Sequence, residues 1–351
     1  MTSVARRFAR GSNVVVDATA AGARLSVVMT TIPGLPAGYT ARRPSLEDAA
    51  PLLTVVHAAE RDALGRDDST LAEVRELLSS KRTPPETDHW LVESGGGPVA
   101  WGMVTDDYGG EQIDLDVFAD PRHPGAIGEL LLDVLLERVR ELAREREKAE
   151  VTVGAGVIVG DEPYAAALRA RGFVAERRFN RLRIDFDGGF PVPSRPAGVA
   201  LAGFDAGSDR DWADWHEILF ASFADHWGFE EVSFGAWREA LAAEEDPEFA
   251  RWRFAVVDGR RAGICQASGR FVSEGGGWIR NLGVMSSARG RGAGRYLLES
   301  ALASYAADGR SWAGLGVDTR NVSGALRLYE SAGMRPWMQI DAFRRRFRAD
   351  D

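Results

Sequence analysis

The sequence predicts an α/β protein made of two tandem copies of one unit, each a mixed sheet flanked by helices. The chain has 351 residues, about twice a common domain length. A segment dense in Gly and Pro, 188–197, lies near its middle, and a similar order of elements can be read on either side. We therefore expect domains at 37–187 and 198–351, joined by a linker at 188–197.

Residues 1–36 are expected to be a poorly ordered extension. Met29 is a second plausible start, so the first 28 residues are left out of the fold prediction. Basic residues near the N-terminus precede only three valines, a run too short for a signal sequence, which needs about 7–15 apolar residues. A cytoplasmic location is predicted.

Each copy is expected to open with a strand, at 39–42 and 199–202, followed by two helices. Ser45 and Asp48 resemble a capping box, and acidic residues at 209–211 indicate the corresponding helix start in the second copy. Hairpin strands follow near 89–93 and 99–104, and near 254–257 and 262–268.

Each copy continues with a strand, a glycine-containing turn and an amphipathic helix. These lie at 113–117, 125–128 and 129–143 in the first copy, and at 278–284, 289–294 and 295–307 in the second. A strand, a short helix that ends at Gly172 or Gly333, and a last strand at 181–186 or 342–347 complete each copy. Two copies of this length indicate a domain duplication rather than a solenoid.

Composition argues against several classes of protein. The chain has 43 basic and 52 acidic residues and a net charge of −9, which disfavours nucleic-acid binding and a polybasic membrane surface. We find no apolar run of the roughly 18 residues that span a membrane. A single cysteine, Cys265, excludes an internal disulfide, and five histidines without a ligand spacing predict no metal site.

The turn before the last long helix predicts a phosphate site. Arg289-Gly290-Arg291-Gly292-Ala293-Gly294 lies between a strand and a helix, where unpaired backbone N–H groups and the helix dipole favour an anion. Glycines let the backbone approach a diphosphate, and the two arginines could add charge-assisted bonds. A plain solvent-facing turn is the alternative. The spacing fits neither GxGxxG nor a Walker loop.

The same turn resembles the acetyl-CoA motif of the GNAT superfamily, [Arg/Gln]xxGx[Gly/Ala], through Arg289, Gly292 and Gly294. A second segment, 321–334, resembles that family's NxxAxxLYExxGF element. The resemblance implies two tandem GNAT domains, each with a mostly antiparallel sheet and one splayed parallel strand pair. It also implies acetyl-CoA as cosubstrate, bound by Leu282, Gly283, Val284, Arg289, Gly290, Arg291, Gly292, Ala293, Gly294, Arg295, Asn321 and Ser323.

In that family the strand before the turn carries a bulge, and its freed N–H groups bind pantetheine and the thioester oxygen. By resemblance these are the backbones of Leu282 and Val284. Tyr329 matches the tyrosine that protonates the leaving thiolate, although its place in a helical apolar stripe also suits a core residue. Asn321 could cap the following helix, bind the pantetheine arm, or do both.

A general base is not evident. Asp318, after the next strand, is the best carboxylate facing the substrate, with local backbone bonding as the alternative and water as another proton relay. Asp225, His226 and Trp227 lie between the first two helices, in the region that lines the acceptor pocket in this family. They could bind a cationic or sugar-like amine, or be structural.

The first copy looks degraded. Pro124 and Ile127 interrupt its glycine turn, and Leu168 stands where the second copy has Tyr329. A non-catalytic first domain is predicted. The whole resembles tandem GNAT enzymes such as mycothiol synthase, which acetylates a cysteinyl amino-sugar.

The sequence therefore predicts an N-acetyltransferase acting on a small-molecule amine by direct attack, as a monomer or homodimer. The alternatives are a mycothiol synthase-type activity, a non-enzymatic acyl-CoA sensor, and a transferase acting on protein lysines or N-termini.

Overall fold

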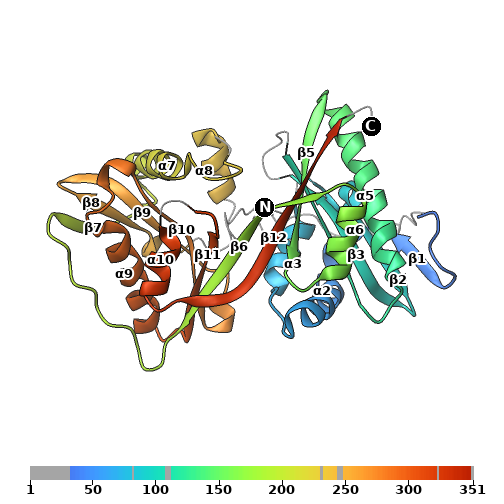
Figure 1. The fold of residues 1–351 in the computed structure, drawn as a ribbon, viewed down its shortest axis with the longest axis horizontal. Coiled ribbons are helices and arrows are strands. Elements are labelled where there is room, and N and C mark those ends of the chain that lie inside the picture. The colour runs from blue at the N-terminus through green and yellow to red at the C-terminus, as the bar shows by residue number, and fades with distance from the viewer. Residues whose placement is uncertain are drawn as a thin grey trace. The chain divides into compact units, whose positions relative to one another are not determined.

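The structure is a computed structural model, which describes residues 32–80, 83–106, 112–229, 232–242, 248–321 and 324–348. These residues form two compact units (Figure 1). The first unit comprises residues up to 177 together with 340–348, and the second comprises 178–339.

The first unit is a mixed sheet between two helical layers. Its strands, in sheet order, are β1 (Tyr39–Arg42), β2 (His89–Ser94), β3 (Gly97–Thr105), β4 (Gln112–Ala119), β5 (Glu150–Ile158) and the end of β12 (Arg335–Arg348). Of these pairs only β4 and β5 run parallel. Its helices are η1 (Leu46–Asp48), α2 (Ala49–Leu64), α3 (Leu71–Leu78), α4 (Pro85–Asp88), α5 (Ala126–Glu145) and α6 (Glu162–Ala170).

Strand β3 shows why helices cover both faces of this sheet. Side chains alternate along a strand, so neighbouring residues point to opposite faces. Ala100 and Val104 belong to the core beneath α5, whereas Trp101 and Met103 belong to the core beneath α2 and α3. All four are fully buried, as a continuous apolar strand in a two-sided sheet requires.

The second unit repeats this architecture. Its strands, in sheet order, are β7 (Val199–Gly203), β8 (Arg253–Val257), β9 (Arg260–Ser268), β10 (Gly276–Val284), β11 (Trp312–Asp318) and the end of β6 (Val174–Asp185). Only β10 and β11 run parallel among the pairs of this unit. Its helices are α7 (Asp209–Phe223), α8 (Phe234–Ala242), η2 (Phe249–Arg251), η3 (Val272–Glu274), η4 (Ser286–Ala288), α9 (Ala293–Ala307) and α10 (Ala325–Ser331).

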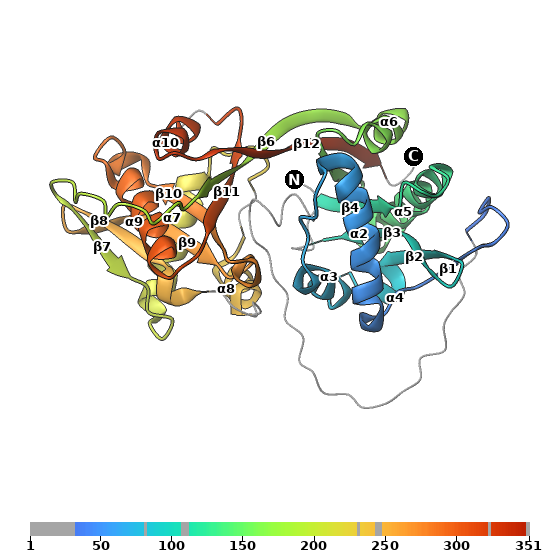
Figure 2. The ribbon, with the colours of Figure 1, turned by 90° about the horizontal axis from the view of Figure 1, so that it is seen from below.

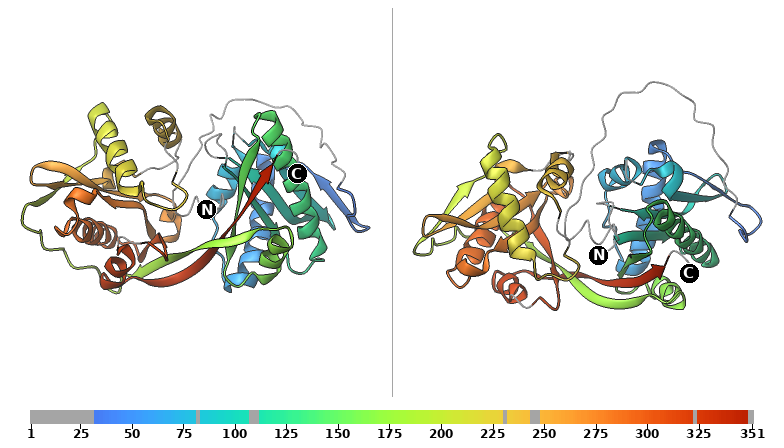
Figure 3. Two further views of the ribbon diagram at one scale, coloured as in Figure 1. Left: turned by 45° about the horizontal axis from the view of Figure 1, so that its top comes forward. Right: turned by 90° about the horizontal axis from the view of Figure 1, so that it is seen from above.

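Glycines on β10 show which helices cover which face of the second sheet. A β-carbon at Gly277 would lie 2.6 Å from the ring of Tyr305 on α9, and one at Gly283 would lie 2.8 Å from Ser222 on α7. The two helices therefore pack on opposite faces, as Figures 1 and 3 also show. Both approaches are close because residues 277 and 283 have no side chain.

The two units exchange their final strands. Strand β6 begins in the first unit, but its residues from 179 onward pair with β11 of the second unit. Strand β12 begins in the second unit, and its residues from 340 onward pair with β5 of the first. The compact units therefore differ from the sequence repeat at 37–187 and 198–351. The repeat boundaries stay a prediction about the duplicated segments.

The predicted fold class is confirmed, and so are several of its local signals. Ser45 and Asp48 form the expected capping box at η1. Gly172 and Gly333, which follow α6 and α10, have φ values of 78° and 95°, so they end these helices in the left-handed region that glycine favours. Among the described residues we find no helix long and apolar enough to cross a membrane.

Candidate active site

The start of α9 presents a row of backbone donors. Gly290 and Gly292 have φ values of 77° and 80°, and Gly292 is the residue that precedes the helix. The first intrahelical bond at this end runs from the Tyr296 N–H to the Gly292 carbonyl. Within the described part of the chain, the N–H groups of residues 290–295 have no acceptor. This backbone fits a diphosphate, which accepts several N–H groups at once. We call residues 290–295 the phosphate cradle.

The arginines of this turn are held by neighbouring groups. Arg291 makes a two-pronged contact with Asp258 at 2.9 and 3.0 Å. Arg289 Nε donates to the Val284 carbonyl at 3.1 Å, and Arg295 bonds Glu299 at 3.0 Å and Ser331 at 2.7 Å. The contacts lie at the surface and orient the guanidinium groups around the turn. A phosphate contact from Arg289 or Arg291 stays a prediction.

Strand β10 separates from β11 directly before this turn. The parallel pairing stops at Ile279 and Leu315, whereas pairing with β9 on the other side continues to Val284. A register shift between Ile279 and Asn281 marks a bulge at Arg280. The sheet therefore opens along the second half of β10.

The N–H groups of Leu282 and Val284 face this opening. The Met285 N–H donates to the Ala262 carbonyl on β9. Because successive N–H groups of a strand point to opposite sides, those of Gly283 and Asn281 also point to β9, and those of Leu282 and Val284 point away from it. Arg289 reaches the Val284 carbonyl on that same side. Two donors thus line a gap in the sheet that leads to the turn.

Tyr329 lies on α10 close to this part of the sheet. Burial and the neighbouring Cys265 thiol raise its pKa, and Cys265 pairs directly with Leu282 across β9 and β10. The Tyr329 side chain is buried. A protonated phenol is therefore held near the splayed strand, as a proton donor to a leaving thiolate requires.

The segment predicted to line the acceptor pocket, which carries Asp225, His226 and Trp227, lies on the α7 face of the second sheet. Ser222 and Phe223, at the end of α7, cover Gly283. Beyond them, the His226 ring lies 4.6 Å from that of Phe223, and the Trp227 ring lies 6.1 Å from that of Phe179 on β6. Phe179 is the register partner of Asp318 at the end of β11. The structure thus brings Trp227 to the strand end that carries Asp318, while Asp225 is exposed.

Asp318 and Asn321 form a turn after β11. An Asp318 carboxylate oxygen accepts the Arg320 N–H at 2.8 Å, and its carbonyl accepts the Asn321 N–H at 3.0 Å. The expected capping of the next helix by Asn321 is wrong: α10 begins at Ala325 with Gly324 before it, at φ 76°. The glycine's left-handed conformation sets the later start. The predicted Ser323 lies outside the described residues.

One polar pair near the opening was not predicted. Asn281 donates to the Gln266 side chain at 2.6 Å, and Gln266 is almost completely buried on β9. A glutamine inside the strand Ile264-Cys265-Gln266-Ala267 breaks its apolar character, and that was the available signal. The pair ties the strands where the bulge interrupts their register.

The first unit lacks the same cradle. Gly125, which precedes α5, has a right-handed φ of −56°, and Ile127 in the first turn is buried. Leu168, at the position that corresponds to Tyr329, is also completely buried. Among the described residues of both units we find no cluster of His, Cys, Asp or Glu that could hold a metal ion.

Comparison with known proteins identifies the family. The model of the acetyltransferase (GNAT) family matches residues 212–334. A mycothiol acetyltransferase of Thermobispora bispora is 31% identical over 236 residues, 64% of this chain and 74% of that protein. The chain belongs to the GNAT family. It is an acyltransferase, and enzymes of this family use acetyl-CoA as cosubstrate.

Other GNAT proteins share parts of the sequence or the fold. A mycothiol acetyltransferase of Acidothermus cellulolyticus is 32% identical over 51% of this chain and 58% of that protein. A GCN5-related N-acetyltransferase from Sphaerobacter thermophilus has a TM-score of 0.77 at 24% identity, covering 90% of this chain and 97% of its own. A tandem GNAT protein from the clavulanic acid biosynthesis pathway has a TM-score of 0.65 at 19% identity, with coverage of 88% and 98%. These two structures support the tandem fold.

Proposed function

We propose that this GNAT enzyme transfers an acetyl group from acetyl-CoA to the primary amine of a small molecule, at a site in the second unit. One observation carries the proposal. The donors of residues 290–295 and the N–H groups of Leu282 and Val284 follow one another along β10 and the turn. A diphosphate and a pantetheine arm present their acceptors in that order.

The residues of the site have separate roles in this proposal. Acetyl-CoA supplies the activated thioester, while the N–H groups of Leu282 and Val284 hold the arm and polarise the carbonyl. The amine nitrogen forms the new C–N bond as the C–S bond breaks. The Tyr329 hydroxyl gives its proton to the sulfur, and the amine's surplus proton leaves through Asp318 or water. Both substrates are present together, so the acetyl group passes directly between them.

The acceptor binds on the α7 side of the sheet in this proposal. Trp227 and Phe179 supply an aromatic surface there, and Asp225, His226 and Asp318 supply polar groups that suit a cationic amine. The Asp318 carboxylate also accepts the Arg320 N–H of its own turn. Water is the alternative relay.

A mycothiol acetyltransferase activity is the second candidate, and the relatives favour it. Both named relatives from Thermobispora and Acidothermus carry that name. A cysteinyl amino-sugar is a small-molecule amine, so this candidate is a special case of the first. A non-enzymatic acyl-CoA sensor is disfavoured by Tyr329, because a binding protein has no need of a buried proton donor near the thioester.

The test is a screen for thiol release with acetyl-CoA and separate panels of amino-sugars, cysteinyl amino-sugars, amino acids and aminoglycosides. Rapid release with one panel, and slow release in buffer alone, would support the proposal and identify the acceptor class. Release that no small amine accelerates, but that peptides with free lysine or N-terminal amines do, would contradict it.

A further inference from the structure

Ser222, near the end of α7, carries a buried hydroxyl that the fold does not use. The side chain is only 6% exposed, and its Oγ atom has no hydrogen-bond partner among the described residues. A serine inside a helix ordinarily points to solvent or bonds a carbonyl one turn earlier, and Ser222 does neither. Because a buried polar group without a partner destabilises a protein, this hydroxyl needs a reason outside the fold.

The Ser222 hydroxyl lies against the opened part of β10. A β-carbon at Gly283 would be 2.8 Å from the Ser222 Cβ atom and 3.1 Å from its Oγ atom. Gly283 stands between Leu282 and Val284, whose N–H groups face the gap in the sheet. Because residue 283 has no side chain, the hydroxyl reaches the strand between the two donors that the proposed function assigns to the thioester.

The hydroxyl and the phosphate cradle lie on opposite faces of the second sheet. A β-carbon at Gly294 of the cradle would be 3.6 Å from both Val284 and Leu328 of α10, so the cradle, α9 and α10 share one face. Figure 2 shows the second unit from this side, and the right panel of Figure 3 shows it from the α7 side. With the cosubstrate in the gap and two helices on one face, the α7 face is left for the approach of the amine.

An aromatic ring and a neutral polar pair lie beside the hydroxyl. The Phe223 ring would be 3.0 Å from the same β-carbon at Gly283. Asn281, two residues before Gly283 and therefore on the same face, bonds the buried Gln266 at 2.6 Å. These neighbours are uncharged, and burial among uncharged groups favours the neutral form of an amine. Only the neutral form has a lone pair with which to attack the thioester.

We propose that the Ser222 hydroxyl binds the amine nitrogen of the acceptor. The proposal rests on the function proposed above, since it needs the thioester at the N–H groups of Leu282 and Val284. The Ser222 oxygen accepts one N–H of the neutral primary amine, which turns the nitrogen lone pair to the thioester carbon. Ser222 keeps its own proton, and the amine's surplus proton leaves through Asp318 or water.

This hydrogen bond strengthens during the reaction. As the C–N bond forms, the nitrogen becomes positively charged, and a charged donor makes a stronger bond to the Ser222 oxygen. An interaction that is stronger in the transition state than in the bound substrate raises kcat. Activity and stability therefore have opposite requirements at residue 222, because the hydroxyl is unpaired in the free protein and paired only in the reacting complex.

The test is Ser222→Ala, which removes the hydroxyl and keeps the Cβ atom that packs on Gly283. Thr105→Val is the matched control, since the Thr105 hydroxyl on β3 of the first unit is also buried and without a partner among the described residues. Urea unfolding measures stability, and calorimetry measures the Kd of acetyl-CoA. Thiol release from acetyl-CoA is followed with glucosamine, cysteinyl-glucosamine, lysine and kanamycin, and the fastest of the four serves as acceptor for both variants.

For Ser222→Ala we expect kcat/KM for the amine to fall about tenfold to a hundredfold, chiefly through kcat, at an unchanged Kd of acetyl-CoA. The midpoint of urea unfolding should rise, because an unpaired buried hydroxyl is removed. Thr105→Val should raise the midpoint as well and keep the kinetics of the wild type.

Unchanged kcat/KM in Ser222→Ala would overturn the proposal. A lower urea midpoint together with lower activity would also overturn it, since the hydroxyl would then support the fold. Wild-type protein that binds acetyl-CoA but releases no thiol with any of the four amines would instead contradict the proposed function.

Discussion

Gly283 on β10 lies against Ser222 on α7 so closely that a β-carbon at residue 283 would come within 2.8 Å of the Ser222 Cβ atom. The ring of Phe223 would be 3.0 Å away. The end of α7 therefore rests directly on the strand, at the point where β10 has separated from β11. This contact connects the opened strand with the segment that carries Asp225, His226 and Trp227.

Gly283→Ala should push α7 away from β10. Overpacking of a tight contact costs about 1–3 kcal/mol, so the free energy of unfolding should fall by that amount. The KM for the amine acceptor should rise as well, because the acceptor segment follows α7. Chemical denaturation and steady-state kinetics measure the two effects. Gly203→Ala on β7, where a β-carbon meets nothing within 4 Å, is the control, and equal behaviour of both variants would contradict the role of this contact.

The phosphate cradle can be tested at Gly290 with two variants of similar shape that differ in charge. A β-carbon there meets no atom within 4 Å, but the residue has a φ of 77°, a conformation that Asn and Asp tolerate best among other residues. Gly290→Asn and Gly290→Asp should therefore share the same strain. Only the aspartate puts an anion next to a diphosphate, so its Kd for acetyl-CoA should be at least about tenfold higher than that of the asparagine variant. Equal affinities of the two variants would place the diphosphate elsewhere.

Tyr329→Phe should lower kcat by about 10²–10⁴ and leave the affinity for acetyl-CoA almost unchanged. Burial and Cys265 raise the Tyr329 pKa above its ordinary value, so the hydroxyl keeps its proton throughout the neutral and mildly alkaline range. The kcat of the wild type should therefore show no alkaline decline between about pH 7 and 9.5. A decline in that range that disappears in Tyr329→Phe would contradict the pKa shift, and an unaltered kcat in the variant would remove Tyr329 from the mechanism.

Much of the fold was readable from local patterns. Apolar residues at helical spacing on α9, such as Leu297, Leu298 and Leu302, are buried as predicted, because one face of the helix must cover the sheet. The Asp258-Gly259 turn and the glycines after α6 and α10 were also readable, since positive φ strongly favours glycine. These signals depend only on near neighbours in the sequence.

The exchange of β6 and β12 between the two units could not be predicted from the sequence. Both strands end their copy, both are rich in Arg and Phe, and each can pair with the corresponding strand of either copy. Which partner is chosen depends on contacts between residues far apart, such as Arg181 with Gly316 and Phe343 with Ala155. A bulge on this strand was expected only by resemblance to the family, because the bulged residues Ile279-Arg280-Asn281 include no glycine or proline to indicate its position.

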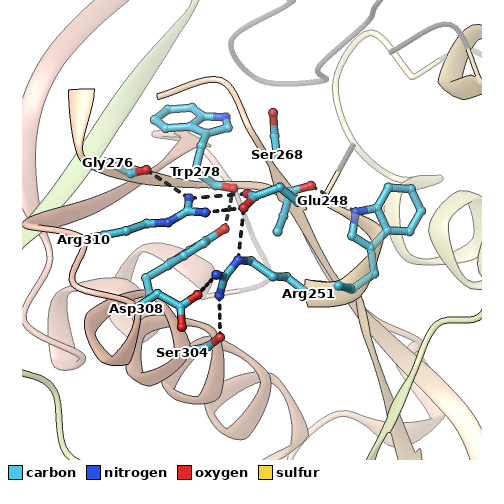
Figure 4. Close-up of polar contacts among 12 residues, drawn as sticks. Glu248, Arg251, Ser268, Gly276, Trp278, Ser304, Asp308 and Arg310 are labelled. Atoms are coloured by element: carbon cyan, nitrogen blue, oxygen red, sulfur yellow. Dashed lines mark hydrogen bonds and ion pairs between the residues drawn. The ribbon is translucent and has the colours of Figure 1, made fainter. Parts of the chain in front are cut away.

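A network of ion pairs connects Glu248, Arg251 and Arg310 in the second unit. Glu248 contacts both Arg251 and Arg310, and Arg310 also donates to the Gly276 carbonyl at 3.0 Å (Figure 4). Arg251 reaches Ser304 and Asp308 at the end of α9. The Glu248 and Arg310 side chains are only 8% and 10% exposed. Their charges therefore depend on each other rather than on water.

Glu248→Gln should destabilise the protein strongly. Removing one partner of a buried ion pair leaves the other charge without compensation, which costs about 3–5 kcal/mol. Asp209→Asn is the matched control, because Asp209 is 85% exposed where it pairs with Arg238, and exposed pairs contribute only about 0–1 kcal/mol. Urea unfolding measures both. A loss for Glu248→Gln no larger than the control would show that solvent screens this network.

The first unit opens its sheet in the same way as the second. Its parallel strands β4 and β5 pair only as far as Asp114 and Gly154. The Tyr164 hydroxyl is buried near Asp116, beyond the last of these pairs, where burial and the Asp116 charge raise its pKa. A phenol thus lies beside the separated part of β4, and the turn before α5 lacks the left-handed glycine of the second unit.

The chain should therefore bind one molecule of acetyl-CoA rather than two. The Ile127, Gly128 and Glu129 N–H groups are bonded within the turn, and Tyr164 lies beside the opening. We therefore expect the first unit to offer neither a phosphate cradle nor space for a pantetheine arm. Calorimetric titration should give a stoichiometry close to one per chain, and Gly290→Asp should weaken that single binding event. A stoichiometry of two, or a second site with equal affinity in Gly290→Asn and Gly290→Asp, would show that the first unit still binds the cosubstrate despite the altered turn.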